Sequence, residues 1–274
     1  MNQPPRLQSI PDSPSALEVR NLSKTFGGVV ALNNVSLYAR AGEVAALVGE
    51  NGAGKSTLIK CVAGVHPPDS GTIHIGGRLV QFDSPFASRL EGIETVYQDL
   101  ALADNLDVAG NIFLGRERSY GIRRGFALRK KEMRRKAKDI LVSYGIKVPS
   151  ISTEAGFLSG GQRQGIAIAR AAEWGSRVVI MDEPTAALGV QETVRVLDLI
   201  VQLAGRGLAV MVVSHNLEQV LEVSTRIWVL RRGRLVASLL TSETNRQAVI
   251  HYITGLTAAS EVEEAPPISR GLHT

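Results

Sequence analysis

The chain has 274 residues, 44% of them hydrophobic and 5% aromatic, with 27 glycines, one cysteine and a formal net charge of +5. This length allows one large domain or two small ones, and many glycines with few aromatics favour an α/β nucleotide-binding protein over a β-sandwich. One cysteine excludes an intramolecular disulfide and a cysteine metal cluster within the chain. No apolar run approaches the ~18 residues of a membrane-spanning helix, and the start, Met1 to Pro5, has no secretory signal pattern. We therefore expect a soluble cytoplasmic protein.

Both ends of the chain are expected to be flexible tails. Residues 1–15 hold four prolines and three serines, and residues 257–274 hold three glutamates and a Pro266-Pro267 pair. Such compositions do not favour a packed core. Between the tails, over residues 16–256, β-branched runs alternate with segments of helical periodicity. This alternation predicts an α/β domain with a largely parallel sheet.

The predicted elements follow the chain in a strand–helix order. The predicted strands are Leu17–Arg20, Val35–Ala39, Val44–Val48, Thr72–Ile75, Leu79–Phe82, Ile93–Tyr97, Val178–Met181, Ala209–Val213 and Ile227–Leu230. Gly76-Gly77 marks a two-residue hairpin turn. Helices are predicted over Lys55–Val62, over most of 107–144, from Ser159 onward and around Val194–Ala204. A helical subdomain of about residues 100–175 is therefore inserted into the α/β core.

A glycine-rich segment directly follows the third predicted strand and precedes a helix. We call it the phosphate loop, and its residues are Gly49, Glu50, Asn51, Gly52, Ala53, Gly54, Lys55 and Ser56. Its glycines let successive backbone N–H groups converge on phosphate oxygens at the positive end of a helix. In such loops the lysine reaches the β- and γ-phosphates and the serine hydroxyl binds Mg²⁺. The sequence therefore predicts a site for ATP or GTP with Mg²⁺ that includes Lys55, Ser56 and the adjacent Thr57.

Two carboxylates end the buried strand Val178–Met181. Parallel sheets bind their ligands at the carboxyl ends of their strands, where Asp182 and Glu183 lie. We expect Asp182 to belong to the Mg²⁺ shell and Glu183 to be the general base that orients and deprotonates the attacking water.

The positive charge is concentrated in one segment. Residues 123–138 hold nine basic residues and one acid, Glu132, so this segment carries +8 and the rest of the chain is close to −3. A solvated helix face, contact with an anionic membrane surface and nucleic-acid binding are all open interpretations. Only one aromatic, Phe126, lies among the charges to stack on bases, and we expect no nucleic-acid partner.

Five short motifs in a fixed order carry a resemblance to a known family. They are the phosphate loop, Gln98, the signature segment Leu158-Ser159-Gly160-Gly161-Gln162, Asp182-Glu183 and Ser214-His215. Over residues 16–255 this combination resembles the nucleotide-binding subunits of ABC transporters. The resemblance implies a P-loop NTPase core of the ABC type, with an antiparallel β subdomain and an inserted α-helical subdomain. It also implies that two such subunits face head to tail, each ATP lying between one phosphate loop and the partner's signature segment.

The same resemblance implies roles for isolated residues. Phe26 occupies the place of an aromatic that stacks on adenine, although an isolated aromatic could equally be core. Gln98 matches the glutamine that touches Mg²⁺ and links the site to the transport subunit, and His215 matches the histidine at the γ-phosphate, although it could merely cap a turn. In the signature segment, Ser159 is a good helix N-cap, and we expect Gly160 and Gly161 to leave their N–H groups bare for a γ-phosphate.

Finer features resemble the ATP-binding subunits of monosaccharide importers of the ribose, xylose and fructose type. They are Gly92–Gln98, Asn105-Leu106, Asn111–Glu117 and Gly189. The resemblance implies a peripheral location at the cytoplasmic face of the membrane, a permease subunit as partner, a second ATPase subunit that is a copy of this chain or a separate partner, and indirectly a sugar-binding protein. An ABC exporter ATPase and a non-transport ABC ATPase acting on DNA or ribosomes are the alternatives.

Gly189 departs from the family pattern. It stands where the family usually has an aspartate, in the loop that crosses to the other subunit. The departure puts that loop's role in doubt and leaves a binding-only regulatory subunit as a further alternative. It does not alter Asp182 or Glu183, so we still expect hydrolysis.

Overall fold

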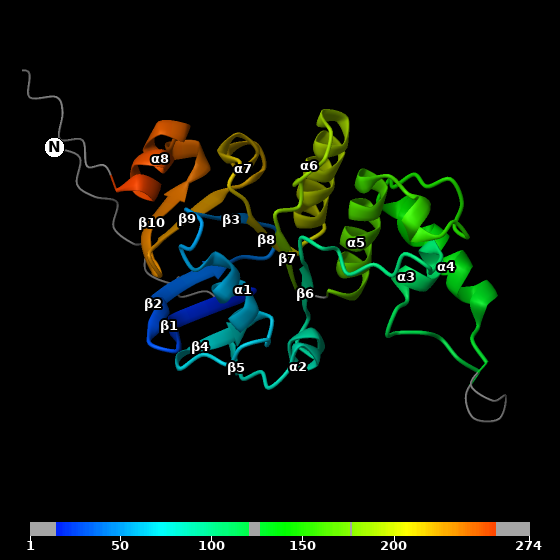
Figure 1. Ribbon diagram of the computed structural model, residues 1–274, viewed down its shortest axis with the longest axis horizontal. Coiled ribbons are helices and arrows are strands. Elements are labelled where there is room, and N and C mark those ends of the chain that lie inside the picture. Colours follow the sequence, from blue (N-terminus) through cyan, green and yellow to red (C-terminus); the bar gives the residue numbers. More distant parts are fainter. Residues whose placement is uncertain (1–14, 121–126, 176, 256–274) are drawn as a thin grey trace, which may run out of the picture.

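The computed structural model describes residues 15–120, 127–175 and 177–255, and both predicted tails lie almost wholly outside these ranges. Two β-sheets lie together toward one end of the long axis of the molecule, and a group of helices forms the other end (Figure 1). The first sheet is antiparallel in the order β2-β1-β4-β5. Its strands are β1 (Leu17–Phe26), β2 (Val29–Ala39), β4 (Ser70–Ile75) and β5 (Arg78–Val80).

The second sheet has the order β10-β9-β3-β8-β7-β6. Its strands are β3 (Val44–Val48), β6 (Ile93–Val96), β7 (Val178–Asp182), β8 (Ala209–Val213), β9 (Arg226–Arg231) and β10 (Arg234–Leu240). All neighbours are parallel except β10 and β9. Strands β3 and β8 are buried along their whole length, as expected for parallel strands covered on both faces.

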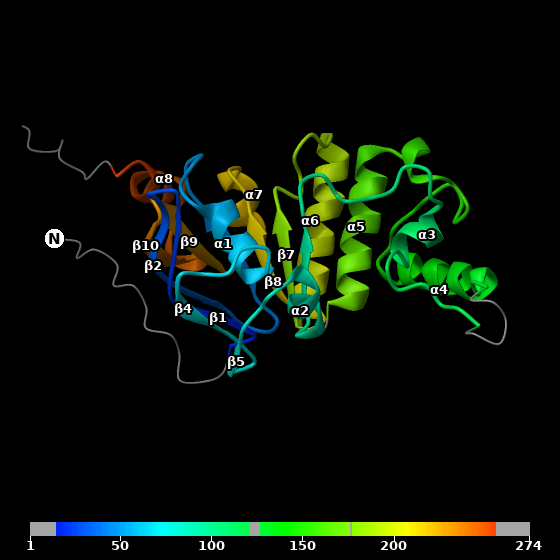
Figure 2. The same cartoon turned by 60° about the horizontal axis from the view of Figure 1, so that its bottom comes forward.

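Helices cover both faces of the parallel sheet and form a separate group at one end. They are α1 (Lys55–Val62), α2 (Pro85–Leu90), α3 (Val108–Ile112), α4 (Lys130–Ser143), α5 (Gly160–Trp174), α6 (Val190–Gly205), α7 (Leu217–Val223) and α8 (Arg246–Thr254), with 3₁₀ turns at Ala155–Phe157 and Thr241–Glu243. Helices α3, α4 and α5 lie between β6 and β7 in the chain and, in both views, at the end opposite the antiparallel sheet (Figures 1 and 2).

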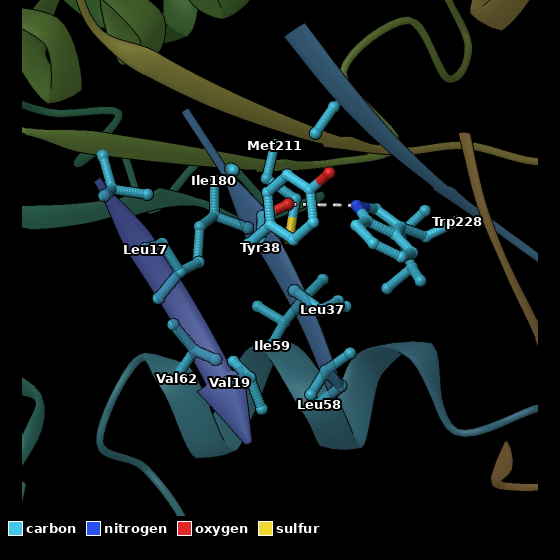
Figure 3. Packing of buried hydrophobic residues seen from close by; sticks show 14 of the residues in the cluster. Leu17, Val19, Leu37, Tyr38, Leu58, Ile59, Val62, Ile180, Met211 and Trp228 are labelled. Atoms are coloured by element: carbon cyan, nitrogen blue, oxygen red, sulfur yellow. Dashed lines mark hydrogen bonds between the residues drawn. The ribbon is translucent and has the colours of Figure 1, made fainter. Parts of the chain in front are cut away.

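Helix α1 is fixed by the core between the two sheets. Leu58, Ile59 and Val62 of α1 pack with residues of both sheets (Figure 3). Beside them the Trp228 indole N–H donates to the Tyr38 carbonyl at 3.1 Å. This packing anchors the helix that follows the phosphate loop. Cys61 on the same helix is also buried.

Alternation along the parallel strands divides the core. On β8, Met211 and Val213 face α1 and the antiparallel sheet, whereas Val210 and Val212 pack with α5 and α6. This is the period of two expected for a strand. The inserted helices have a further cluster of their own, built from α3, α4 and α5.

Most predicted elements are confirmed, and one is wrong in its middle. Helix α1 and strands β3 and β8 have the predicted bounds. The helix expected over 107–144 is interrupted: among the described residues of 113–129 none is helical, and Ser119 and Leu128 form an antiparallel bridge instead. Gly115 has a left-handed φ of 75°, a conformation in which a helix cannot continue.

Part of the basic charge on and near α4 is paired with acidic side chains within the chain. Arg134 pairs with Asp107, Lys136 pairs with Glu173, and Glu132 receives two arginines, Arg118 and Arg129. These pairs favour a solvated, ion-paired face. Arg123 and Arg124 of the basic segment lie outside the described residues. Within the described ranges, no helix has the length and apolar character needed to cross a bilayer.

Candidate functional site

The phosphate loop joins β3 to α1 along a path that glycine makes possible. A Cβ on Gly49 would lie 2.1 Å from the Leu230 carbonyl oxygen, and one on Gly54 would lie 2.6 Å from the Ala31 carbonyl oxygen. At Gly52, where φ is 79°, no atom lies within 4 Å of a Cβ position. The loop is thus packed underneath and presents bare backbone at its tip, which suits it to bind phosphate at the start of α1.

Lys55 begins α1 and turns back over the loop. Its ammonium group donates to the carbonyl oxygens of Gly49 at 2.7 Å and Glu50 at 2.9 Å. Burial lowers the pKa of Lys55, and the nearby carboxylates of Glu183 and Asp182 oppose that shift. The lysine therefore lies where its charge faces both the loop and the carboxylates at the sheet edge. Ser56 and Thr57 follow it in the first turn.

The strand order brings the remaining motifs to one edge of the parallel sheet. Strands β3, β8, β7 and β6 are consecutive and parallel, so their carboxyl ends lie side by side. These ends lead into the phosphate loop, His215, Asp182-Glu183 and Gln98, respectively. The structure thus brings together four motifs from separate parts of the chain, at the edge where parallel sheets bind ligands.

Glu183 and His215 form a direct contact at this edge. The Glu183 backbone has a left-handed φ of 51°, and its N–H donates to the Val213 carbonyl at 2.9 Å. Glu183 Oε1 lies 2.8 Å from His215 Nδ1, with 17% of the glutamate side chain exposed and 72% of the histidine. The histidine thus holds the carboxylate while its other ring nitrogen lies on the opposite side of the ring. A left-handed non-glycine residue is a strain typical of functional sites.

Asp182 ends β7 in an environment that disfavours its charge. Burial raises the pKa of Asp182, the neighbouring Glu183 raises it further, and Lys55 and Lys60 act in the opposite direction. A divalent cation would offset both unfavourable effects. Asp182, Ser56 and Gln98 offer hard oxygen ligands, the type that Mg²⁺ prefers.

Among the described residues, no all-protein metal cage competes with this set of ligands. Over the parts of the chain that the structure describes, no group of three or more His, Cys, Asp or Glu side chains is arranged to hold a metal ion. Magnesium in nucleotide sites is usually held by one or two protein oxygens together with substrate phosphates and water. The residues at the sheet edge therefore fit a magnesium ion that is bound with its nucleotide.

Phe26 and Gln98 are both accessible. Phe26 is the last residue of β1 and is 42% exposed, so it is not part of the core. Its ring meets the His66 ring edge-on at 5.2 Å, and the Lys24 ammonium lies 5.4 Å from its centroid. Gln98 lies two residues beyond β6 with an exposed side chain.

The signature segment forms the start of α5. Ser159 is the N-cap: its hydroxyl accepts from the Gln162 N–H at 3.3 Å, and the Gln162 side chain accepts from the Ser159 N–H at 3.0 Å. This capping box satisfies two backbone donors reciprocally. Gln162 also donates to the Lys147 carbonyl at 3.3 Å. In this chain, the Gln162 side chain therefore stabilises the start of α5.

A residue that the sequence did not reveal lies over this helix end. Glu192 Oε1 accepts from the Ser159 hydroxyl at 3.0 Å and from the Gly161 N–H at 3.4 Å, and its Oε2 accepts from the Gly189 N–H at 3.3 Å. The expectation that the Gly161 N–H is bare is therefore wrong, because a carboxylate from α6 already binds it. Gly161 permits this approach, since a Cβ there would lie 2.8 Å from the glutamate side chain.

The signature helix and the phosphate-loop helix are far apart in one chain. Figures 1 and 2 show α1 on one side of β7 along the long axis, and α5 on the other side beyond α6. A site that uses both helix ends at one phosphate therefore needs two chains.

The comparisons with known proteins assign these motifs to a family. Residues 32–186 match the family model described as ABC transporter. The chain belongs to the ABC transporter family. Two curated relatives match over nearly their whole length. The xylose/arabinose import ATP-binding protein XylG of Sulfolobus acidocaldarius is 45% identical over 87% of this chain and 93% of that protein. The fructose import ATP-binding protein FrcA of Rhizobium meliloti is 44% identical over 87% of this chain and 94% of that protein.

Other ABC matches support the same assignment. The ribose import ATP-binding protein RbsA of Yersinia pestis is 41% identical over 87% of this chain, which spans only 46% of that longer protein. A nucleotide-free ATP-binding cassette from an ABC transporter has a TM-score of 0.73 at 25% identity, over 88% of this chain and 95% of that one. A dimeric post-hydrolysis cassette bound to ADP and Pi has a TM-score of 0.70 at 25% identity, over 82% and 98%. The predicted ABC ATPase fold is thus confirmed.

Proposed function

We propose that this ABC protein is the ATP-binding and ATP-hydrolysing subunit of a sugar importer. The observation that carries the hydrolytic part is the 2.8 Å contact of Glu183 with His215 beside Lys55, because it fixes a base next to the phosphate-binding loop. The import part is supported by the two relatives of matching length, whose names state import of xylose or arabinose and of fructose.

The proposed reaction is transfer of the γ-phosphoryl group of ATP to water. The water oxygen bonds to the γ-phosphorus, the bond to the bridging oxygen breaks, and ADP leaves with that oxygen. Glu183 takes the proton of the water as general base, while Lys55 stabilises charge on the phosphates. His215 keeps the Glu183 carboxylate in place by donating from Nδ1, and its second nitrogen would donate to the γ-phosphate when it carries a proton as well. When bound, Mg²⁺ neutralises charge on the β- and γ-phosphates, and Ser56, Gln98 and Asp182 are the residues that would hold it.

A complete ATP site is proposed to form between two copies of the chain. One copy provides Phe26 for stacking on adenine and the phosphate loop with Thr57 for the phosphates, and the other provides the start of α5 at Ser159 and Gly160. The separation of α1 from α5 along the molecule supports this division (Figure 1). It is further supported by the fold shared with a dimeric cassette.

The energy of ATP is proposed to drive a membrane permease. We expect this ABC subunit to bind the cytoplasmic face of that permease near Gln98, and the permease to receive sugar from a separate sugar-binding protein. Closure of the ATPase dimer on ATP and its reopening after hydrolysis would move the permease between its two states.

Sugar uptake in cells that lack the gene tests this function. We would measure entry of labelled xylose, arabinose, fructose and ribose, with complementation by the wild type or by Glu183→Gln. We expect one sugar to be lost and to be restored only by the wild type, because the variant keeps the nucleotide site but lacks the base. Normal uptake of every sugar, with an active purified ATPase, would contradict sugar import and leave ATP hydrolysis standing.

A further inference from the structure

Arg170 connects the signature helix, α5, to the loop that contains Gln98. It lies on α5, eleven residues after Ser159, and its guanidinium donates to two backbone carbonyls at once. Nη1 donates to the Ala101 oxygen and Nη2 to the Leu100 oxygen, both at 2.9 Å. Because α5 rises about 1.5 Å per residue, the two ends of this connection are ~16 Å apart along one rigid helix.

The two bound carbonyls belong to a strained turn. Leu100 and Ala101 have consecutive left-handed φ values of 60° and 45°, a conformation that costs roughly 1–2 kcal/mol for each non-glycine residue. The Leu100 N–H donates to the Tyr97 carbonyl at 2.9 Å, so Gln98 lies inside the turn. Such strain persists only where surrounding contacts impose it, and the Arg170 guanidinium is a contact of this kind.

The surroundings of Arg170 favour an arginine at this position. Arg170 is half-buried, and its charge is partly offset by the nearby Glu94 carboxylate, which is 12% exposed and also pairs with Arg89 and Arg116. The planar guanidinium can bind two adjacent carbonyls simultaneously, whereas a lysine ammonium is a point donor without this fixed geometry. Seven residues earlier on α5, Arg163 pairs with Asp104 at 2.7 Å. The signature helix therefore holds the loop after Gln98 at two points.

We propose that Arg170 is a positioning residue for ATP hydrolysis, which sets the place of Gln98 by holding the carbonyls of Leu100 and Ala101 to the signature helix. A displacement of α5 would then move the loop that contains Gln98. The inference rests on the proposed function of this site, and in particular on the role of Gln98 as a Mg²⁺ ligand.

The magnesium dependence of ATP hydrolysis tests this role. We would titrate Mg²⁺ at fixed ATP with the purified full-length protein and compare Gln98→Ala, Arg170→Ala, Arg170→Lys and the double variant Gln98→Ala/Arg170→Ala. We expect each alanine variant to raise the Mg²⁺ concentration for half-maximal activity by about tenfold, as expected for the loss of one hydrogen bond or ligand contact to a charged group. We expect the double variant to show no larger shift than Gln98→Ala, and Arg170→Lys to recover part of the wild-type affinity.

Arg206→Ala is the matched control. Arg206 also donates to a backbone carbonyl, that of Ser143, and stacks on Tyr144 at 4.3 Å, but it joins the ends of α4 and α6 rather than the glutamine loop. We expect its half-activating Mg²⁺ concentration to equal that of the wild type, whatever the change in melting temperature.

Three results would overturn the inference, and they are distinguishable. A wild-type Mg²⁺ dependence in Arg170→Ala, with only a lower melting temperature, would make Arg170 merely structural. Additive shifts in the double variant would mean that Arg170 acts independently of Gln98. If Gln98→Ala itself left the Mg²⁺ dependence unchanged, the metal role of Gln98 would fail, whereas a wild type without Mg²⁺-dependent ATP hydrolysis would refute the proposed function as a whole.

Discussion

His215 matters through the carboxylate that it contacts. Because Nδ1 lies 2.8 Å from Glu183 Oε1, the ring N–H can donate to the ionised carboxylate and fix its orientation. We expect His215→Ala to lower kcat by roughly 100-fold, at the lower end of what a positioned proton-transfer group contributes, with ATP affinity little changed. Steady-state kinetics and equilibrium nucleotide binding measure the two quantities. His251→Ala, which replaces an exposed histidine on α8, is the control, and equal kcat values for the two variants would contradict the argument.

Glu192 gives the protein a pH-dependent contribution to stability. The Ser159 hydroxyl, followed by the Gly189 N–H, lowers the pKa of Glu192 below its ordinary value of 4.5. The folded state therefore favours the carboxylate, and the stabilisation is complete above pH 4.5 and lost as the pH falls through the lowered folded-state pKa.

The expected result is a difference in melting temperature that depends on pH. The wild type should melt above Glu192→Gln at neutral pH, and the difference should shrink as the pH is lowered below 4.5. Differential scanning fluorimetry from pH 7 downward measures it, with Glu218→Gln on the exposed side of α7 as control. A difference that stayed constant over the acidic range would show that the carboxylate charge is not responsible.

At the scale of elements, the phosphate loop depends on glycines for two different reasons. Gly54→Ala combines a left-handed φ of 105° with a Cβ 2.6 Å from the Ala31 carbonyl, whereas Gly52→Ala has only the unfavourable φ of 79°. Backbone strain costs roughly 1–3 kcal/mol of unfolding free energy, so we expect Gly52→Ala to lose about that much and Gly54→Ala to lose more. Urea denaturation measures both, and equal losses would refute the predicted clash.

The sequence predicted those elements whose signals are continuous along the chain. The buried runs Val44–Val48 and Ala209–Val213 and the glycines before Lys55 are local patterns, and the structure has the corresponding elements within one residue. The interruption after α3 was not predicted, although Gly115 marks it, because the residues on either side, Ile112–Leu114 and Arg116–Arg118, are compatible with a helix. Helix α2 was missed because it has only six residues, of which only Ser88 is buried, so no periodicity marks it.

The site residues that were not predicted from the sequence, Arg170 and Glu192, make contacts with distant segments of the chain. Arg170 contacts a loop about 70 residues away and Glu192 contacts a helix start 31–33 residues away. Neither separation is visible in a linear pattern. A signal for Glu192 did exist, because a glutamate three residues after a helix N-cap is one half of a capping box, and Gly189 is that N-cap.

At the scale of the whole molecule, the distance between α1 and α5 predicts an association that depends on ATP. We expect Glu183→Gln with MgATP to sediment as a dimer and to return to a monomer with ADP, because only an intact γ-phosphate would connect one phosphate loop to the partner's signature segment. Sedimentation velocity measures this. Gly160→Asp, added to the same variant, should keep it monomeric. The aspartate would add a second negative charge, beside that of Glu192, at the start of α5 and would repel the phosphate. A dimer that formed equally with ADP, or in spite of Gly160→Asp, would contradict the prediction.

The single cysteine gives the nucleotide site an internal chemical reporter. Cys61 is 1% exposed on the helix behind the phosphate loop, and burial raises the pKa of its thiol to about 11. At neutral pH the thiol is therefore almost entirely protonated and out of reach of alkylating reagents while α1 remains packed. Alkylation of Cys61 therefore requires that α1 separates transiently from the core, and its rate reports how often this opening occurs. Since a ligand that binds the folded state suppresses such openings, the unmodified protein can report nucleotide binding through the slowing of one reaction at one sulfur atom.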